Sequence, residues 1–515
     1  MKRPDRLVVG RVVATWWLPV VVACAVGGLY VCLSLAQWRA LVVPSWDLGI
    51  FAEAVQAYSR FEAPIVPIKG PGYNLLGDHF HPILALLGPV YRLFPSALTL
   101  LVVQDVLIAV SVLPVARLAQ RLFGRGGAVI VGLGYGLGWG LQGAVGAQFH
   151  EVCVAVPLLA LGGVAFVERR WGACMGWLAP LVLVKEDLGL TVFVAGLALA
   201  WRGRGEGRPA VLRGLAYALF GIIAFVVTVK VLLPAMNPAG TWAYSLDGSA
   251  TGAGTPMGGS TAARQVPSLW DILTTPSVKL ITLLVLAAGA GFVGASSPWF
   301  ALVLPTLAWR FAGSVDTYYV WDSWHYNAVL VPIAACSLLD VINRWCEPER
   351  AAPAVSVHAP VDGSGLEETG DTCVGQVATL SPSRGRRAAA WAVACVPALS
   401  LAITASALPL WQLPTLTEDP RMAAAQGALD AVPVGASVET DTTLLARLVP
   451  GREVYWVGTT GKMETPPEYV VIDVRSYAWG GHQVDAESWA SAAHPGHTYE
   501  TIYSKAGFRV ARRTS

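Results

Sequence analysis

The chain has 515 residues, of which 54% are hydrophobic and 14% are charged, and its mean hydropathy is +0.53. Soluble globular proteins typically contain about 25% charged residues, so this composition excludes an ordinary soluble protein and predicts an all-α polytopic membrane bundle. The net charge is only +2, and no basic patch with interleaved aromatic residues occurs, so nucleic acid is not expected as a partner.

Apolar segments recur along most of the chain, and a membrane-spanning helix needs about 20 apolar residues. The first segment is longer than the apolar core of a cleavable signal peptide, so we expect it to remain as a helix. The run 81–94 is too short to span easily and is expected to be re-entrant or interfacial. We expect about eleven transmembrane helices, near residues 12–36, 97–119, 126–146, 152–168, 171–184, 188–202, 211–234, 276–295, 298–311, 326–344 and 387–411.

Arginines are concentrated in alternate loops of this arrangement. Because loops rich in Lys and Arg stay on the cytoplasmic side, the N-terminus is predicted to be cytoplasmic and the C-terminus extracytoplasmic. The arginines that set this orientation include Arg117, Arg121, Arg125, Arg169, Arg170, Arg202, Arg204, Arg208, Arg213, Arg344 and Arg350.

Three segments lie outside the apolar runs, namely residues 37–80, 347–386 and 412–515. Residues 1–346 form the predicted bundle, and its first outer loop, 37–80, contains an amphipathic stretch from Leu48 to Phe61 that we expect to lie in the membrane interface. Residues 347–386 are rich in Pro, Gly, Ser and acidic residues and are predicted to be a disordered cytoplasmic loop. The last helix, 387–411, leads to residues 412–515.

Residues 412–515 have the pattern of a small α/β domain, in which short apolar strands alternate with helical stretches. The helical stretch Ala423–Ala431 precedes the first of these strands. We expect the segment Gly507–Arg513 to be an edge strand. The predicted strands are Ser437–Thr440, Glu453–Val457, Tyr469–Val474 and Phe508–Ala511.

Five polar clusters border the apolar segments, and threading the chain through a bilayer places all five on the outer face. Ionisable groups at membrane depth cost several kcal/mol unless they are paired, so they commonly mark function. Convergence on one face predicts a single site. The clusters are Trp46-Asp47-Leu48-Gly49, Gly77-Asp78-His79-Phe80-His81, Phe149-His150-Glu151, Lys185-Glu186-Asp187 and Asp322-Ser323-Trp324-His325.

Each cluster also has a purely structural interpretation. Asp47 could cap the helix that follows it, because Asp is a preferred N-cap residue. His150 and Glu151 could belong to a solvated turn, and so could residues 185–187. The aromatic residues around Asp322 suit a sugar ring, but an interfacial aromatic belt explains them equally well.

Two further features of the sequence bear on a substrate. Lys185 could meet a phosphate while Glu186 or Asp187 orients it. The segment 237–244, which ends at Tyr244, precedes a Gly- and Ser-rich stretch and could form a lid over the site.

The clusters, in this order, resemble a family of bacterial polytopic membrane proteins grouped as domain of unknown function 2079. The resemblance covers roughly residues 40–345, and the small C-terminal domain also fits. The motifs that carry it are Trp46-Asp47-Leu48-Gly49-Ile50-Phe51, Gly77-Asp78-His79-Phe80-His81-Pro82, Phe149-His150-Glu151, Lys185-Glu186-Asp187-Leu188-Gly189 and Asn237-Pro238-Ala239-Gly240.

That family is in turn similar in layout to the GT-C class of membrane glycosyltransferases, which use polyprenyl-phosphate sugars and an acidic residue of the first outer loop as base. The resemblance implies a GT-C-like bundle in a bacterial plasma membrane, with Asp47 as base and Asp78 as second choice. Asp47 departs from the class in having no adjacent acid.

Carried onto this chain, the resemblance implies that Lys185, with His79 or His81, neutralises the phosphate of the lipid-linked donor. The acceptor would be a cell-envelope glycan or lipid, and membrane lipids would surround the bundle. Asp78 and Glu151 are candidate ligands for a divalent cation, and no other cofactor is indicated. The remaining candidate substrate-binding residues are His150, Glu186, Asp187, Tyr244, Asp322 and His325.

Two other functions remain open at this point. A transporter or flippase also places charges in a helical bundle, although such proteins commonly show repeated halves and broken helices near the midplane. A non-catalytic membrane scaffold with a partner-binding tail is the third interpretation, and it leaves the charged clusters without a role.

Overall fold

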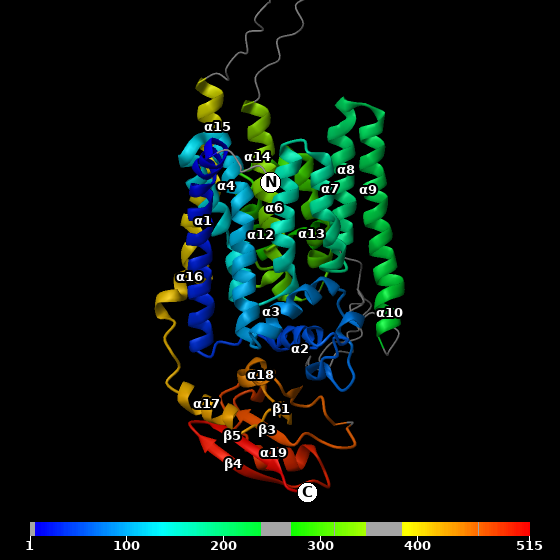
Figure 1. Ribbon diagram of the computed structural model, residues 1–515, viewed down its shortest axis with the longest axis vertical. Coiled ribbons are helices and arrows are strands. Elements are labelled where there is room, and N and C mark those ends of the chain that lie inside the picture. Colours follow the sequence, from blue (N-terminus) through cyan, green and yellow to red (C-terminus); the bar gives the residue numbers. More distant parts are fainter. Residues whose placement is uncertain (1–5, 238–268, 314, 347–383, 462) are drawn as a thin grey trace, which may run out of the picture.

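The computed structural model describes residues 6–237, 269–313, 315–346, 384–461 and 463–515. A tall helical bundle occupies one end of the molecule and a small α/β domain the other (Figure 1). Helices α2 (Asp47–Ser59) and α3 (Gly88–Leu93) lie between the two parts. The α2 helix confirms the helix expected in the first loop.

The bundle helices follow the apolar segments of the sequence closely. Several of them continue into tighter or wider turns, such as the 3₁₀ turns Glu151–Val154 before α6 and Ala179–Leu183 after α7. The helices are α1 (Arg6–Arg39), α4 (Ala97–Gly136), α5 (Trp139–Gly146), α6 (Ala155–Val167), α7 (Trp171–Leu178), α8 (Leu188–Arg202), α9 (Arg208–Val227), α10 (Leu233–Met236), α11 (Leu269–Thr274), α12 (Val278–Gly289), α13 (Leu304–Ala312), α14 (Leu330–Cys346), α15 (Arg384–Thr404) and α16 (Pro409–Gln412).

Helix α4 contains a sharp reversal at Gly124, whose φ of 73° is available mainly to glycine. The reversal accounts for the two separate helices expected at 97–119 and 126–146. Among the described residues, five helices are long and apolar enough to cross a membrane, and several shorter apolar helices accompany them. The count of eleven crossings and the direction of the termini stay predictions.

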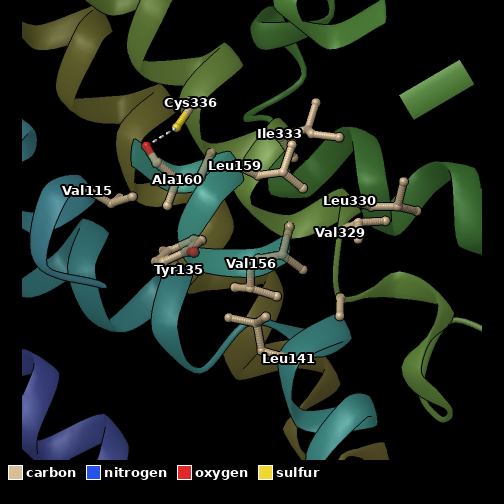
Figure 2. Close-up of a cluster of buried hydrophobic side chains, with 14 of the residues drawn as sticks. Val115, Tyr135, Leu141, Val156, Leu159, Ala160, Val329, Leu330, Ile333 and Cys336 are labelled. Carbon is tan, nitrogen blue, oxygen red and sulfur yellow. Dashed lines mark hydrogen bonds between the residues drawn. The ribbon is translucent and has the colours of Figure 1, made fainter. Parts of the chain in front are cut away.

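The centre of the bundle is a close contact between α6 and α14, which Figure 2 shows with part of α4. A Cβ added to Gly163 would lie only 2.5 Å from the sulfur of Cys336, so glycine permits this approach. Val156, Leu159 and Ile333 are fully buried beside it. The contact holds together two helices whose preceding loops carry His150, Glu151 and His325.

The C-terminal domain contains a five-stranded sheet of order β2-β1-β3-β5-β4. Strand β1 pairs in parallel with β2 and β3, whereas β5 is antiparallel to β3 and β4. The small α/β domain is thereby confirmed. Its elements are α17 (Met422–Asp430), β1 (Ser437–Thr440), α18 (Thr442–Leu448), β2 (Glu453–Trp456), β3 (Tyr469–Asp473), α19 (Ala486–Ala493), β4 (Tyr499–Lys505) and β5 (Phe508–Arg513).

The expectation of an edge strand at residues 507–513 is wrong. Strand β5 lies inside the sheet, because β4 covers its outer side. Strand β4 is largely polar and mostly exposed, so it lacks the short apolar run by which the other strands are recognised.

Helix α2 is buried on most of its surface, because the bundle lies on one side of it and the C-terminal domain on the other. A Cβ on Gly49 would lie 2.9 Å from the Leu445 side chain of α18, so glycine permits this contact. The buried carboxylate of Glu53 accepts hydrogen bonds from the backbone N–H groups of Ile68 (3.1 Å) and Val454 (3.2 Å). Glu53 thus joins α2 to the first loop and to edge strand β2.

Replacing Glu53 with Ala removes the acceptor of both N–H groups. An unsatisfied buried N–H costs about 1–3 kcal/mol, so we expect the C-terminal domain to separate from α2 more readily and protease to cut the linker before α17 faster. Glu53→Gln keeps one acceptor oxygen and should show a smaller effect. Glu62→Ala, which removes an exposed partner of Arg60, is the matched control. Equal cleavage rates in Glu53→Ala and Glu62→Ala would contradict this role.

Candidate functional site

The polar clusters predicted to converge do so through contacts between loops that are distant in sequence. Asp47 is the first residue of α2, and its carboxylate lies 3.5 Å from the Nε2 atom of His150. The ring of His150 stacks on that of His325, with centroids 3.6 Å apart. The position that caps α2 belongs to Trp46, which makes no side-chain capping bond. Asp47 is therefore a member of a histidine cluster rather than an N-cap.

Phe51 of α2 brings a third histidine to the same place. Its ring lies edge-on to those of His81, at 5.5 Å, and His150, at 5.8 Å. Within the part of the chain that the structure describes, neither ring nitrogen of His81 has a hydrogen-bond partner, and Nδ1 of His325 also lacks one. Buried polar atoms without partners are costly, so these nitrogens are candidate ligand contacts.

Two ion pairs connect the remaining clusters. Lys185 donates to Glu151 at 2.8 Å, and Glu186 lies 3.3 Å from Nδ1 of His79 while accepting the N–H of Phe80 at 3.1 Å. The Lys185 and Glu151 side chains are only 13% and 3% exposed. The solvated-turn interpretations of these clusters are therefore wrong.

Two further predicted residues are held at the edge of this group. Asp78 accepts a hydrogen bond from Lys69 at 2.7 Å, and Asp187 accepts one from the indole N–H of Trp309 at 2.9 Å. The candidate cation ligands Asp78 and Glu151 thus each face a lysine. Across the described residues, no group of three or more His, Cys, Asp or Glu side chains is arranged to hold a metal ion. A cation at Asp78 and Glu151 stays a prediction.

Asp322 has a hydrogen-bond partner next to it in the sequence. Asp322 is half-buried and accepts a hydrogen bond from the adjacent Ser323 at 3.3 Å, and the structure records no contact between it and Asp47 or His150 among the described residues. Tyr244 and most of the predicted lid fall outside the described residues, as does most of the loop expected at 347–386.

The pKa values of the acidic groups in the first loop are set by competition between burial and neighbouring charge. Burial alone would raise the pKa of Asp47, but the hydrogen bond and charge of His150 outweigh it and lower that pKa to about 2. Burial would likewise raise the pKa of Asp78, but the charges of His79 and Lys69 outweigh it and lower that pKa. Both carboxylates are therefore ionised at neutral pH.

The histidines of the same loop differ in charge. Burial lowers the pKa of His81 to about 4, so its ring is neutral at pH 7. Burial also acts to lower the pKa of His79, but the carboxylates of Asp78 and Glu186 outweigh it and raise that pKa. The loop therefore presents one histidine that favours the cationic form and one that is neutral.

Sequence reasoning missed two cations of this region. Lys69 is the partner of Asp78. Arg310 is fully buried and donates to the Tyr318 carbonyl at 2.7 Å and to the Asn327 side-chain oxygen at 2.8 Å. It thereby fixes the segment that contains His325. Its place near the end of an apolar run was the available signal.

Replacing Lys185 with Met leaves Glu151 buried without its counter-ion. Removal of one partner from a buried ion pair costs about 3–5 kcal/mol, so we expect a large fall in the thermal unfolding temperature. The double variant Lys185→Met/Glu151→Gln should recover most of that loss, because no unpaired charge remains. Arg60→Met, at an exposed pair, is the control. A double variant as unstable as the sum of its two single variants would show that the pair is not coupled.

Comparison with known proteins places the chain in a family. The family model described as "Predicted membrane protein (DUF2079)" matches residues 38–510. No curated protein matches the chain.

The chain is also similar to two solved structures of ArnT from Cupriavidus metallidurans. One, bound to undecaprenyl phosphate, is 12% identical, with 96% of this chain and 97% of that chain covered and a TM-score of 0.45. The other, in the apo state, is 14% identical, with 94% and 97% covered and a TM-score of 0.41. The family match covers most of the sequence, and the chain belongs to the DUF2079 family of predicted membrane proteins.

Proposed function

We propose that the protein is an integral-membrane glycosyltransferase that moves a sugar from a polyprenyl phosphate to a hydroxyl group of a cell-envelope glycan or lipid on the outer face of the membrane. The observation that carries the proposal is the state of Asp47. Its carboxylate is ionised, 31% of its side chain is exposed, and it lies beside the histidines and ion pairs of the converging clusters.

Asp47 is suited to receive the proton of the acceptor. The acceptor oxygen forms a bond to the anomeric carbon as the bond from that carbon to the phosphate oxygen breaks, and the electron pair leaves with the phosphate. A carboxylate with a pKa of about 2 is a weak base. It therefore takes the proton late, once bond formation has made the hydroxyl strongly acidic. Asp78 is less suited, since its side chain is 2% exposed and paired with Lys69.

The phosphate of the donor needs positive charge where its own negative charge develops. Lys185 and His79 are the proposed contacts. Their carboxylate partners Glu151 and Glu186 hold them in fixed positions before the donor arrives. The neutral ring of His81 and the Oδ1 atom of Asp187, which is buried without a hydrogen-bond partner among the described residues, complete the proposed donor side. His150 and His325 keep Asp47 oriented.

Asp47→Asn removes the proton acceptor without changing the size of the side chain. In protein reconstituted with polyprenyl-phosphate sugars, we expect transfer to fall by at least about a hundredfold, within the range for loss of a general base, while bound donor lipid, measured by native mass spectrometry, stays near the wild-type level. Asp430→Asn, an exposed position of α17, is the matched control. Wild-type-like transfer by Asp47→Asn would remove Asp47 from the mechanism.

The same lipid measurement tests Lys185. Lys185→Ala should reduce the amount of bound polyprenyl phosphate far more than Arg204→Ala, which alters an exposed arginine of another loop. Equal losses would exclude a phosphate contact by Lys185. Recovery of ordinary phospholipid alone, unchanged by either substitution, would shift support to the transporter and scaffold alternatives.

The dependence of transfer on pH tests the role of His150. Since the pKa of Asp47 is about 2, the wild-type rate should not fall through protonation of Asp47 between about pH 7 and 5. His150→Gln removes the charge that opposes burial, so the pKa of Asp47 rises and the acidic limb of kcat/KM moves to higher pH. His482→Gln, at an exposed position, is the control. Superimposable profiles for His150→Gln and wild type would contradict the pairing.

A further inference from the structure

A group of aromatic side chains that the proposed chemistry does not use includes the residue next to Asp47. Trp46, which precedes it, lies edge-on to Trp456 at the end of β2, with ring centroids 5.6 Å apart. The ammonium of Lys69 lies 5.6 Å from the Trp46 ring and 5.2 Å from the Tyr73 ring. The three aromatic residues are only half-buried. They come from the start of α2, the first loop and the C-terminal domain.

The C-terminal domain places the carboxyl edge of its parallel strands close to this group. Strand β1 lies between β2 and β3, so the chain passes from β1 to β2 on one side of it and then to β3 on the other side. Such a reversal of strand order is where ligands bind in open parallel sheets. Thr442 follows β1 and Ser476 follows β3, and their hydroxyl oxygens lie 3.0 Å apart.

Tyr477 projects from this edge and is 60% exposed. Burial raises the pKa of Tyr477, a hydrogen bond with Thr442 opposes the rise, and the negative charge of Asp47 adds to it. Tyr477 directly follows Ser476 at this edge, and Trp456 at the end of the neighbouring strand β2 contacts Trp46, the residue before Asp47. The sheet edge and the start of α2 therefore contribute side chains to the same space.

This combination of groups suits a ring that bears several hydroxyl groups. Aromatic faces pack against the C–H faces of such a ring, while a few polar groups fix its orientation. Lys69 keeps ammonium protons beyond the one donated to Asp78. A free phosphate suits the space less well, because Asp78 neutralises Lys69 and Asp47 adds a negative charge.

We propose that Trp46, Tyr73, Trp456 and Tyr477 form the subsite for the sugar or polyol ring that carries the acceptor hydroxyl, with that hydroxyl directed at Asp47. The inference rests on the proposed function, because it assigns the acceptor of that reaction. It makes the C-terminal domain part of the active site rather than a separate module.

Ligand binding can be measured without turnover. The full-length protein in lipid nanodiscs, free of sugar-headed detergent, would be titrated with the methyl glycosides of glucose, mannose and galactose and followed by saturation-transfer NMR. We expect ring protons of at least one glycoside to receive saturation. Tyr477→Ala should weaken that binding about tenfold, which is the scale of a lost aromatic contact. Trp411→Ala, at a position 63% exposed on α16, should leave it unchanged.

Because Trp456 packs against Trp46, Trp456→Phe is the milder second variant, and it should also weaken binding. Tyr477→Phe separates stacking from the phenol, since it keeps the ring. Binding that is unaffected by both Tyr477→Ala and Trp456→Phe would overturn the subsite, and so would the absence of binding of any of the three glycosides to the wild type.

Failure of the proposed function has a different signature. Glycoside binding lost in Tyr477→Ala but unaccompanied by any transfer from polyprenyl-phosphate sugars would keep the subsite and reject the transferase. Transfer by the wild type with an acceptor KM unchanged in Tyr477→Ala would keep the transferase and reject the subsite.

Discussion

Burial of charge at one end of an apolar bundle is the constraint on which the rest of the structure depends. An unpaired charge in such surroundings costs several kcal/mol, and the chain meets this cost by pairing groups from different loops. Lys185 faces Glu151, and His79 faces Glu186. Each pair spans two connections between helices, so neutralising the charges also fixes the loops relative to one another. The same contacts that make the charges tolerable therefore build a defined site.

Packing inside the bundle also holds these loops in position. The α6–α14 contact, which Gly163 makes close, holds the loop before α6 beside the loop before α14. That is why the rings of His150 and His325 can stack although they are far apart in sequence. Arg310 adds a second support, because its hydrogen bonds to neutral oxygens hold the segment that contains His325.

Asp47 differs from the other carboxylates of the group. Its side chain is 31% exposed, whereas those of Asp78, Glu151 and Glu186 are at most 5% exposed. Its distance to its partner, 3.5 Å, is also the longest of the four pairs. Its position also depends on α2, which is clamped between the bundle and the C-terminal domain by Glu53. A group that is charged, oriented and reachable is suited to act on a substrate, whereas Asp78 and Glu151 are suited to hold cations in place.

The sequence by itself determined the membrane class, the positions of most helices, the small α/β domain and the set of residues that converge. Hydropathy and periodicity are local properties of the chain, so they identify such elements directly. Only the tertiary structure decided which charges pair, that β5 is an inner strand, that Lys69 and Arg310 contact residues of the predicted clusters or their flanking segments, and that Glu53 joins α2 to the C-terminal domain. These outcomes depend on contacts between residues that are distant in sequence. A single carboxylate has the same local pattern whether it caps a helix, neutralises a lysine or faces a substrate, because its partner is chosen by the fold.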